Sequence, residues 1–260
     1  MTHAFTVFLY TFGLFLGMLL FLEIGRRAAA WRLKKDSETA GEGVGAVDGA
    51  VFALLGLLIA FTFSGASSRF DTRRQLIVEE TNHIGTAYLR LDLLPAESQP
   101  PLRESFRRYL DARIEAYRKL PDIAAAKKQL AKANELQKQI WRQAVAASRA
   151  ESAQPAAAIL LLPALNAMID ITTSRTMATQ MHPPAVVFVM LFGLALAASL
   201  LAGYGMSGSK VRSWFHMLGF ALVMAFAVYV ILDLEYPRLG LIRVDAFDEA
   251  LVDLRESMKP

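Results

Sequence analysis

The stretch that decides the fold is residues 45–95, which read GAVDGAVFALLGLLIAFTFSGASSRFDTRRQLIVEETNHIGTAYLRLDLLP. Its first part, through Phe63, is almost free of charge and matches the roughly 20 apolar residues that cross a bilayer core as a helix. Its second part, from Arg69 onward, carries a dense band of arginines and carboxylates. No proline occurs before Pro95, and the glycines between are isolated, so nothing ends the helix earlier. We therefore predict one helix that leaves the membrane and continues unbroken to about Leu93.

Apolar residues elsewhere in the chain are also gathered into blocks of nearly spanning length. The chain has 260 residues, of which 54% are hydrophobic, and a soluble protein would spread them periodically. The blocks are 5–22, 45–63, 185–204 and 214–232. His3 is the only ionisable side chain before the first block and basic residues follow the block, which is the reverse of a secretory signal. These blocks predict an all-α, polytopic membrane protein with four transmembrane helices.

Between the second and third blocks, the composition is that of a soluble helical insert. Residues 104–120 place apolar side chains at helical spacing between charges, and Pro121 ends that helix. Asp122 suits the N-cap of the next helix, which is rich in strong helix formers. A third segment, residues 154–184, is apolar but interrupted by Pro163, so we predict a buried helix that returns to the bilayer rather than a fifth span.

The chain divides accordingly into four segments. Residues 1–65 hold transmembrane helices 1 and 2, residues 66–183 form the helical extramembrane insert, residues 184–234 hold transmembrane helices 3 and 4, and residues 235–260 form a C-terminal tail. The chain shows no internal repeat and no strand pattern of any weight.

Residues that would carry enzyme or nucleic-acid chemistry are missing from the sequence. There is no cysteine, which excludes disulfides and thiolate metal sites, and no zinc-protease, phosphate-loop or serine-hydrolase motif. Glu79 and His83 stand four apart without a second such pair, so we expect a packed histidine rather than a metal ligand. The basic flanks of the spans explain the net charge of +4. We expect no enzyme, no cofactor, no metal and no nucleic-acid partner.

Three blocks of the sequence carry a family resemblance. They are LLIAFTFSGASSRFDTRRQLIVEETNHIGTAYLRLDLLP (57–95), LPALNAMIDITTSRT (162–176) and ILDLEYPRLGLIRVD (231–245). Together, and in this order, they resemble the bacterial bestrophin-like membrane proteins. The true bestrophins, to which the likeness is weaker, are pentameric ion channels with four transmembrane helices per subunit and a pore lined by the second. The resemblance implies a homo-oligomer, a pentamer, in the bacterial inner membrane.

The resemblance places the pore constriction, or gate, at Ala53, Leu57 and Phe61 of the second helix. Residues four apart lie along one stripe of a helix, and a ring of apolar side chains can gate a channel by dewetting. The bestrophin neck is bulky at all three levels, whereas Ala53 is small. The alternative is that the stripe faces lipid or packs against another helix, since such a helix is apolar all round.

Charged residues beyond the second span are candidates for a vestibule. Arg69, Arg73 and Glu80 fall within a narrow arc of the predicted helix, and around an oligomer they would form charged rings that set ion preference. The alternative is a set of intramolecular ion pairs that hold this helix to the insert. Asp233 and Glu235, after the last span, are either an interfacial anchor or an acidic element that binds a cation.

The function that we expect is passive conduction of small inorganic ions by a homo-oligomer in the lipid bilayer. The alternative from another class is a non-conducting membrane scaffold or sensor whose helical insert binds a partner. A channel requires the second span to face a symmetry axis, whereas a scaffold would bury that span within one subunit.

The short loops hold an excess of basic residues on one side of the membrane. These residues are Arg26, Arg27, Arg32, Lys34 and Lys35 in the first loop and Lys210 and Arg212 in the third. Short loops rich in lysine and arginine stay in the cytoplasm, whereas long inserts count little. The charges predict cytoplasmic first and third loops, with both termini and the insert outside, which is the reverse of the true bestrophins.

Labelling of intact cells with an impermeant maleimide tests this orientation. The substitutions Ser98→Cys in the insert and Ser207→Cys in the third loop, made singly, each introduce the only cysteine of the chain. We expect labelling of the Ser98→Cys variant alone, because the insert faces the outside. Labelling of the Ser207→Cys variant but not of Ser98→Cys would reverse the orientation.

Overall fold

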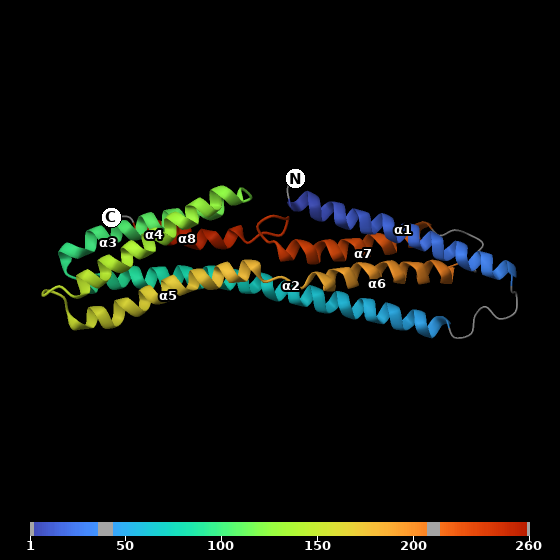
Figure 1. The fold of residues 1–260 in the computed structure, drawn as a ribbon, viewed down its shortest axis with the longest axis horizontal. Coiled ribbons are helices and arrows are strands. Elements are labelled where there is room, and N and C mark those ends of the chain that lie inside the picture. The colour runs from blue at the N-terminus through green and yellow to red at the C-terminus, as the bar shows by residue number, and fades with distance from the viewer. Residues whose placement is uncertain (1–2, 36–43, 207–213, 259–260) are drawn as a thin grey trace. The chain divides into compact units, whose positions relative to one another are not determined.

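The computed structural model describes residues 3–35, 44–206 and 214–258, and all regular structure in these ranges is helical (Figure 1). The α-helices are α1 (His3–Lys35), α2 (Val44–Leu89), α3 (Gln99–Arg118), α4 (Ile123–Ser148), α5 (Pro155–Gln180), α6 (Ala185–Gly205), α7 (Trp214–Glu235) and α8 (Asp245–Ser257). Two 3₁₀ turns, η1 (Arg90–Leu93) and η2 (Ala96–Ser98), join α2 to α3. The predicted all-α class is confirmed. Ser207, Lys210 and Arg212 of the orientation prediction lie outside the described residues.

Four stretches are long and apolar enough to cross a membrane, as predicted. They lie within His3–Arg32, Gly45–Leu93, Pro155–Gly205 and Trp214–Glu235. The third stretch includes both α5 and α6, but the backbone leaves the helix over residues 181–184, where two prolines stand in succession. The 21 residues of α6 therefore supply the length of that span by themselves.

The helix α2 runs unbroken from Val44 to Leu89, so its apolar half and its charged half belong to one element. The predicted continuity is confirmed, because the backbone stays helical between Ser64 and Arg74 and then tightens into η1. Pro95 follows the turn and ends the helical path, as its fixed φ and missing N–H lead one to expect.

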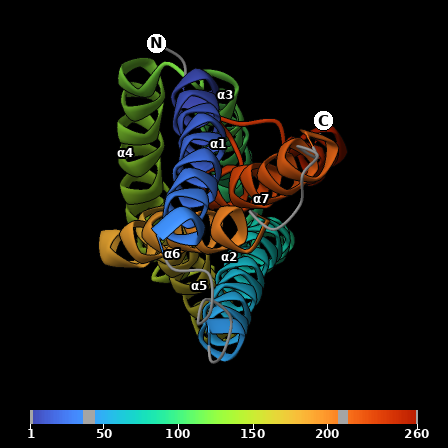
Figure 2. The same ribbon diagram turned by 90° about the vertical axis from the view of Figure 1, so that its right-hand side faces the viewer.

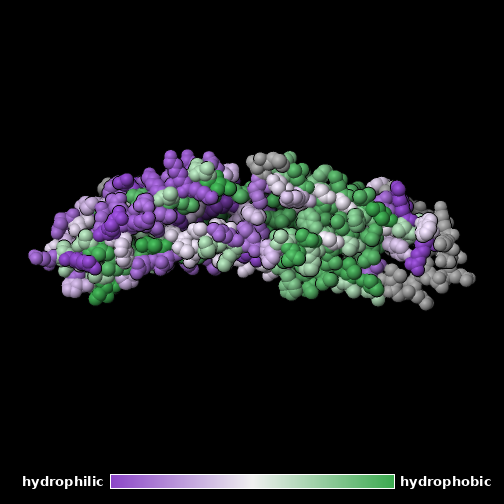
Figure 3. Space-filling view, in the orientation of Figure 1, coloured by the Kyte–Doolittle hydropathy of each residue, from purple (hydrophilic) through white to green (hydrophobic). Residues whose placement is uncertain are grey.

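The chain forms two compact units. The first contains the residues up to Ser68 together with His182–Tyr236, and the second contains Arg69–Met181 together with the residues from Pro237 onward. The visible face of the first unit is largely hydrophobic, and that of the second is largely hydrophilic (Figure 3). This difference is what a bilayer around the first unit and water around the second require.

In the first unit, α1 and α6 approach so closely that their backbones touch at two glycines. A Cβ atom on Gly25 would lie 2.0 Å from the carbonyl oxygen of Leu200, and one on Gly203 would lie 1.9 Å from that of Leu22. Small residues are what allow such an approach between membrane helices, which gain no hydrophobic energy from contacting each other rather than lipid. Among the glycines that the structure describes in this unit, Gly25 and Gly203 therefore mark the closest approach of two helices.

The second unit has a hydrophobic core built by α3, α4, α5, α8 and the end of α2. Its largest fully buried members include Phe106, Tyr109, Leu110, Ile140 and Leu161. The Tyr109 hydroxyl accepts a hydrogen bond of 3.1 Å from the Gln137 amide, and burial raises the pKa of the phenol. The predicted helical spacing of α3 is thus confirmed by its buried face.

The ends and interruptions of α4 and α5 show which local signals hold. The predicted N-cap of α4 is confirmed, since the Asp122 carboxylate accepts a hydrogen bond of 3.0 Å from the backbone N–H of Ala125. The helix predicted within residues 154–184 is present as α5, and Pro163, which interrupts the apolar run of the sequence, lies inside this helix without ending it. Leu161 and Leu165, on either side of it, are fully buried, and this packing offsets the hydrogen bond that a proline removes.

Substitution of Gly25 tests the helix crossing in the first unit. We expect Gly25→Val to lower the thermal stability of the detergent-solubilised protein strongly, because the new side chain meets backbone that cannot rotate away. Overpacking of a well-packed site costs about 1–3 kcal/mol, and contact with backbone belongs at or above the upper end. The control is Gly13→Val on the same helix, where a Cβ meets nothing within 4 Å. Equal stability of the two variants would contradict the crossing.

Candidate pore-lining face and buried ion-pair network

The apolar half of α2 has one covered face and one uncovered face within its own unit. Leu55, Thr62 and Ala66 are buried. On the other side, Leu57 and Phe61 are 52% and 69% exposed, and Ala53 is exposed as well. The structure therefore places all three residues of the predicted constriction on the face that the subunit leaves open. Whether that face lines a pore stays a prediction.

The uncovered face changes character just beyond Phe61. Ser64 and Ser68, three and seven residues further along, are exposed hydroxyl side chains on the same side of the helix. In the second unit, most exposed positions of α2 carry amide, carboxylate or hydroxyl groups, among them Gln75, Glu79, Asn82 and Thr86, while Val78 and Leu89 are exposed apolar residues. Exposed polar groups need water or a polar partner, so this part of the face is built for an aqueous surrounding.

Arg73 has a structural partner in its own unit. Arg73 is 7% exposed, and its guanidinium donates hydrogen bonds of 3.0 Å from Nε to the carbonyl of Ala178 and from Nη2 to the carbonyl of Met181. These carbonyls lie at the C-terminal end of α5, where the backbone oxygens lack helical partners and the helix dipole is negative. Arg73 therefore caps α5 from α2.

Glu80 lies at the centre of a buried ion-pair network. Its carboxylate has no exposed surface and accepts hydrogen bonds from Arg113 of α3, at 2.7 Å, and from Arg175 of α5. Arg113 also donates to the Tyr117 hydroxyl at 2.6 Å. Burial by itself would lower the pKa of the Arg113 guanidinium, but Tyr117 and Glu80 outweigh it and hold that pKa above its usual range. One carboxylate thus joins three helices.

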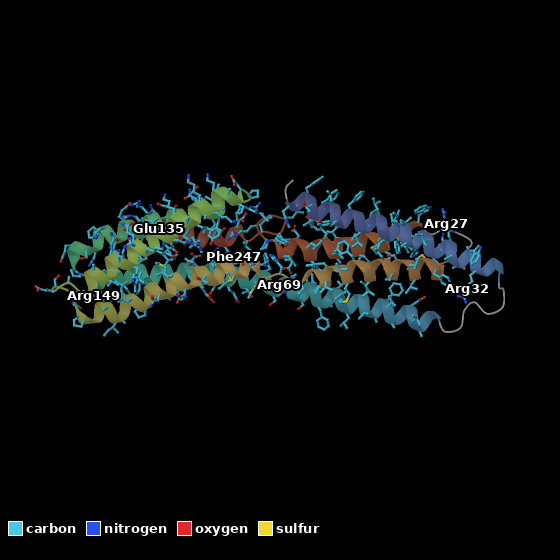
Figure 4. The ribbon with its side chains drawn as sticks, viewed as in Figure 1. Arg27, Arg32, Arg69, Glu135, Arg149 and Phe247 are labelled. Atoms are coloured by element: carbon cyan, nitrogen blue, oxygen red, sulfur yellow. The ribbon has the colours of Figure 1, made fainter. Side chains whose placement is uncertain are left out.

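The network extends through the Tyr117 ring to the C-terminal part of the chain. The guanidinium carbons of Arg175 and Arg238 lie 4.3 and 4.4 Å from the ring centroid, a distance at which cation–π attraction is strong. Arg238 pairs bidentately with Asp248 of α8, at 2.6 and 2.9 Å. From the other side, Arg74 lies 4.2 Å from the ring centroid of Phe247, the α8 residue labelled in Figure 4. These contacts fasten α8 to α2, α3 and α5.

The predicted vestibule residues therefore divide into two groups. Arg73 and Glu80 are buried and bonded inside the subunit, so the intramolecular alternative describes them. Arg69, which Figure 4 labels on α2, is half-buried, and its place in a charged ring stays a prediction. The sequence did not point to Arg113, Tyr117, Arg238 or Asp248. For Asp248 a signal was available, because the acidic first turn and basic last turn of α8 mark a short amphipathic helix.

The acidic stretch after the last span is anchored in the first unit. Asp233 and Glu235 are buried, and Glu235 Oε2 lies 3.2 Å from His182 Nδ1. The Tyr236 ring stands between His182 and His3, with centroids 4.4 and 4.2 Å away. Nowhere in the described ranges do three histidine, aspartate or glutamate side chains converge as metal ligands would. These contacts support the reading of this stretch as an interfacial anchor.

A model of the Bestrophin-like domain matches residues 8–246. The chain belongs to the Bestrophin-like family. Comparison with the curated proteins found no match.

Solved structures show the same fold as this Bestrophin-like chain. A crystal structure of a bacterial bestrophin homolog from Klebsiella pneumoniae carrying a mutation has a TM-score of 0.72 at 14% identity, covering 95% of this chain and 98% of that chain. A second variant of the homolog has a TM-score of 0.70 at 14% identity, with 93% and 97% covered. A crystal structure described as a membrane protein has a TM-score of 0.66 at 14% identity, with 95% and 98% covered. At these identities the likeness concerns the fold.

Removal of the Glu80 carboxylate tests the network. We expect Glu80→Ala to lower the free energy of unfolding by about 3–5 kcal/mol, because two buried guanidinium groups then lose their counter-charge. Thermal unfolding of the solubilised protein measures the loss. The matched control is Glu79→Ala, one residue earlier and exposed, for which a change within about 0.5 kcal/mol is expected. If both variants unfold at the same temperature as the wild-type protein, the network does not stabilise the second unit.

Proposed function

We propose that this Bestrophin-like protein forms a ring of identical subunits, a pentamer, that conducts small inorganic ions passively through a pore lined by the apolar half of α2. The observation that carries the proposal is the uncovered face of α2, on which Ala53, Leu57 and Phe61 give way to Ser64 and Ser68. Membership of the Bestrophin-like family supports it.

The membrane spans differ in how much of their surface the rest of the subunit buries, and a ring of subunits explains the difference. Only 11% of the most apolar part of α2 is buried in the subunit, against 28% for α1 and 39% for α7. A helix that packs at the centre of its own subunit would be covered most. A helix that faces a symmetry axis is covered least by its own chain, because its inner face meets the pore and its flanks meet neighbouring subunits.

The residue types along this face suit a hydrophobic gate. A narrow ring of Leu57 and Phe61 side chains resists wetting, because water and ions that enter it lose contacts that hydrocarbon cannot replace. The hydroxyl groups of Ser64 and Ser68 can hydrogen-bond to water directly beyond the ring. An ion would therefore meet one short apolar barrier followed by a polar surface, and the width of the apolar ring would decide whether it conducts.

Flux through reconstituted liposomes tests the gate. We expect the double change Leu57→Ala and Phe61→Ala to raise ion flux, because smaller side chains widen the ring and lower the cost of wetting it. The matched control is Leu222→Ala with Phe226→Ala on α7. These two residues are also four apart, and their exposures of 62% and 64% resemble those of the gate pair. Flux through the control variant should remain at the wild-type level.

The opposite result would favour the scaffold. If Leu57 and Phe61 pack in a protein interior, their truncation leaves a cavity, and Phe→Ala alone then costs about 3–5 kcal/mol of stability. A gate variant with lower thermal stability and unchanged or lower flux would contradict the channel and support a non-conducting membrane scaffold.

A further inference from the structure

The outer side of α4 is a basic stripe. Its exposed charged residues are Lys127, Lys128, Lys132, Lys138 and Arg142, with Glu135 as the one acid among them. The opposite side of the helix, including Ala133, Leu136 and Ile140, is buried in the core of the second unit. Glu135 pairs with Lys138 at 2.7 Å. Among the described residues, Lys128 and Lys132 have no carboxylate partner.

The outer side of α8 is acidic. Its exposed carboxylates include Asp245, Glu249 and Asp253, which are four residues apart and therefore share one side of the helix. Leu251, on the other side, is buried. The one basic residue of α8, Arg255, pairs with Asp111 of α3 at 2.7 Å. No described residue forms an ion pair with Glu249 or Asp253.

The two stripes lie on opposite sides of α3, which separates them. Toward α4, Ser105 donates a hydrogen bond to Gln143 at 3.0 Å. Toward α8, Arg107 donates to the carbonyl of Met258 at 3.3 Å. Residues 105 and 107 are two apart, which is about 200° around a helix of 3.6 residues per turn. Figure 2 shows α4 and the C-terminal end of the chain on either side of α3.

We infer that α4 of one subunit docks on α8 of the next, with Lys128 and Lys132 facing Glu249 and Asp253. The inference rests on the ring of subunits proposed above and names its contact outside the membrane-spanning helices. A subunit cannot bring its own stripes together across α3, but a second copy of the chain can. Two different faces on opposite sides of a protomer make a head-to-tail interface, which is the kind that closes a ring.

The surface around the basic stripe of α4 also includes apolar side chains, which a protein interface needs in addition to charges. A surface hollow of about 940 Å³ lies between α4 and α5, next to the stripe, and its lining includes Trp141, Ile169 and Met177. Met177 is 47% exposed in the single subunit. Interfaces place aromatic residues and methionine at their centre and charges at the rim, where the charges guide the choice and orientation of the partner.

Cross-linking of the full-length protein tests the docking. The double variant Lys132→Cys with Asp253→Cys has no other cysteine, so a short bis-maleimide can link only these two positions. We expect a ladder of covalent products from dimer to complete ring, because each subunit offers one position to each neighbour. Either single substitution should give no ladder. The control pair is Arg149→Cys with Asp253→Cys, since Arg149 is also exposed but follows the last residue of α4, 17 residues or about 25 Å along the helix axis from Lys132 and beyond the reach of a short linker (Figure 4).

Charge reversal provides the second measurement. Lys128→Glu with Lys132→Glu should weaken association about tenfold or more, because like charges then face each other. Adding Glu249→Lys and Asp253→Lys should restore it, and native mass spectrometry in detergent reads both results. If the wild-type protein forms a ring but the Lys132→Cys with Asp253→Cys variant gives no ladder, or if the reversal variants assemble as well as the wild type, the docking would be overturned and the proposed channel would still stand. A monomeric wild-type protein would overturn both.

Discussion

A single carboxylate that never meets water governs the second unit. Glu80 is fully buried, and a buried charge persists in a protein only when counter-charges and hydrogen bonds replace its hydration. The replacements come from Arg113 and Arg175, on two other helices. Any rearrangement that separates α2 from α3 or α5 would leave at least one of these ions alone in a low-dielectric interior. The three helices are therefore bound to move together or not at all.

The same network determines what the C-terminal segment can do. Arg175 and Arg238 share the Tyr117 ring, and Arg238 holds Asp248, so α8 depends on the residues that also satisfy Glu80. The two arginines that contact this ring repel each other, and the negative charges of Glu80, which pairs with Arg175, and Asp248, which pairs with Arg238, together offset that repulsion. The acidic outer side of α8 is then presented by a firmly held helix. A charged surface on a fixed helix costs less entropy to bind than one on a mobile tail.

Local signals in the sequence were sufficient to predict the helices. They could not predict which side chains from distant segments of the chain contact one another. The lack of proline before Pro95 predicted the continuity of α2, and Asp122 marked the start of α4. Spacing along α2 placed Arg73 and Glu80 on one arc but could not say what covers that arc. The partners of Glu80 lie 33 and 95 residues away along the chain, and nothing in the intervening sequence announces them. Pro163 does not end α5, because the burial of Leu161 and Leu165 on either side of it outweighs its local effect.

The touching glycines of α1 and α6 leave these two helices a single alignment. A shift of α1 by one residue would bring Ile24 or Arg26 to the place of Gly25, against the backbone of Leu200. Hydrophobic contacts along membrane helices are interchangeable and would tolerate such sliding, whereas two bare Cα atoms facing carbonyl oxygens would not. This backbone contact therefore fixes the register of α1 relative to α6 along their axes. Arg32 of α1 donates a hydrogen bond of 3.1 Å to the Tyr204 hydroxyl of α6, and this bond depends on the same register. The glycine contact therefore also determines where along the membrane normal the polar groups of Arg32 and Tyr204 meet.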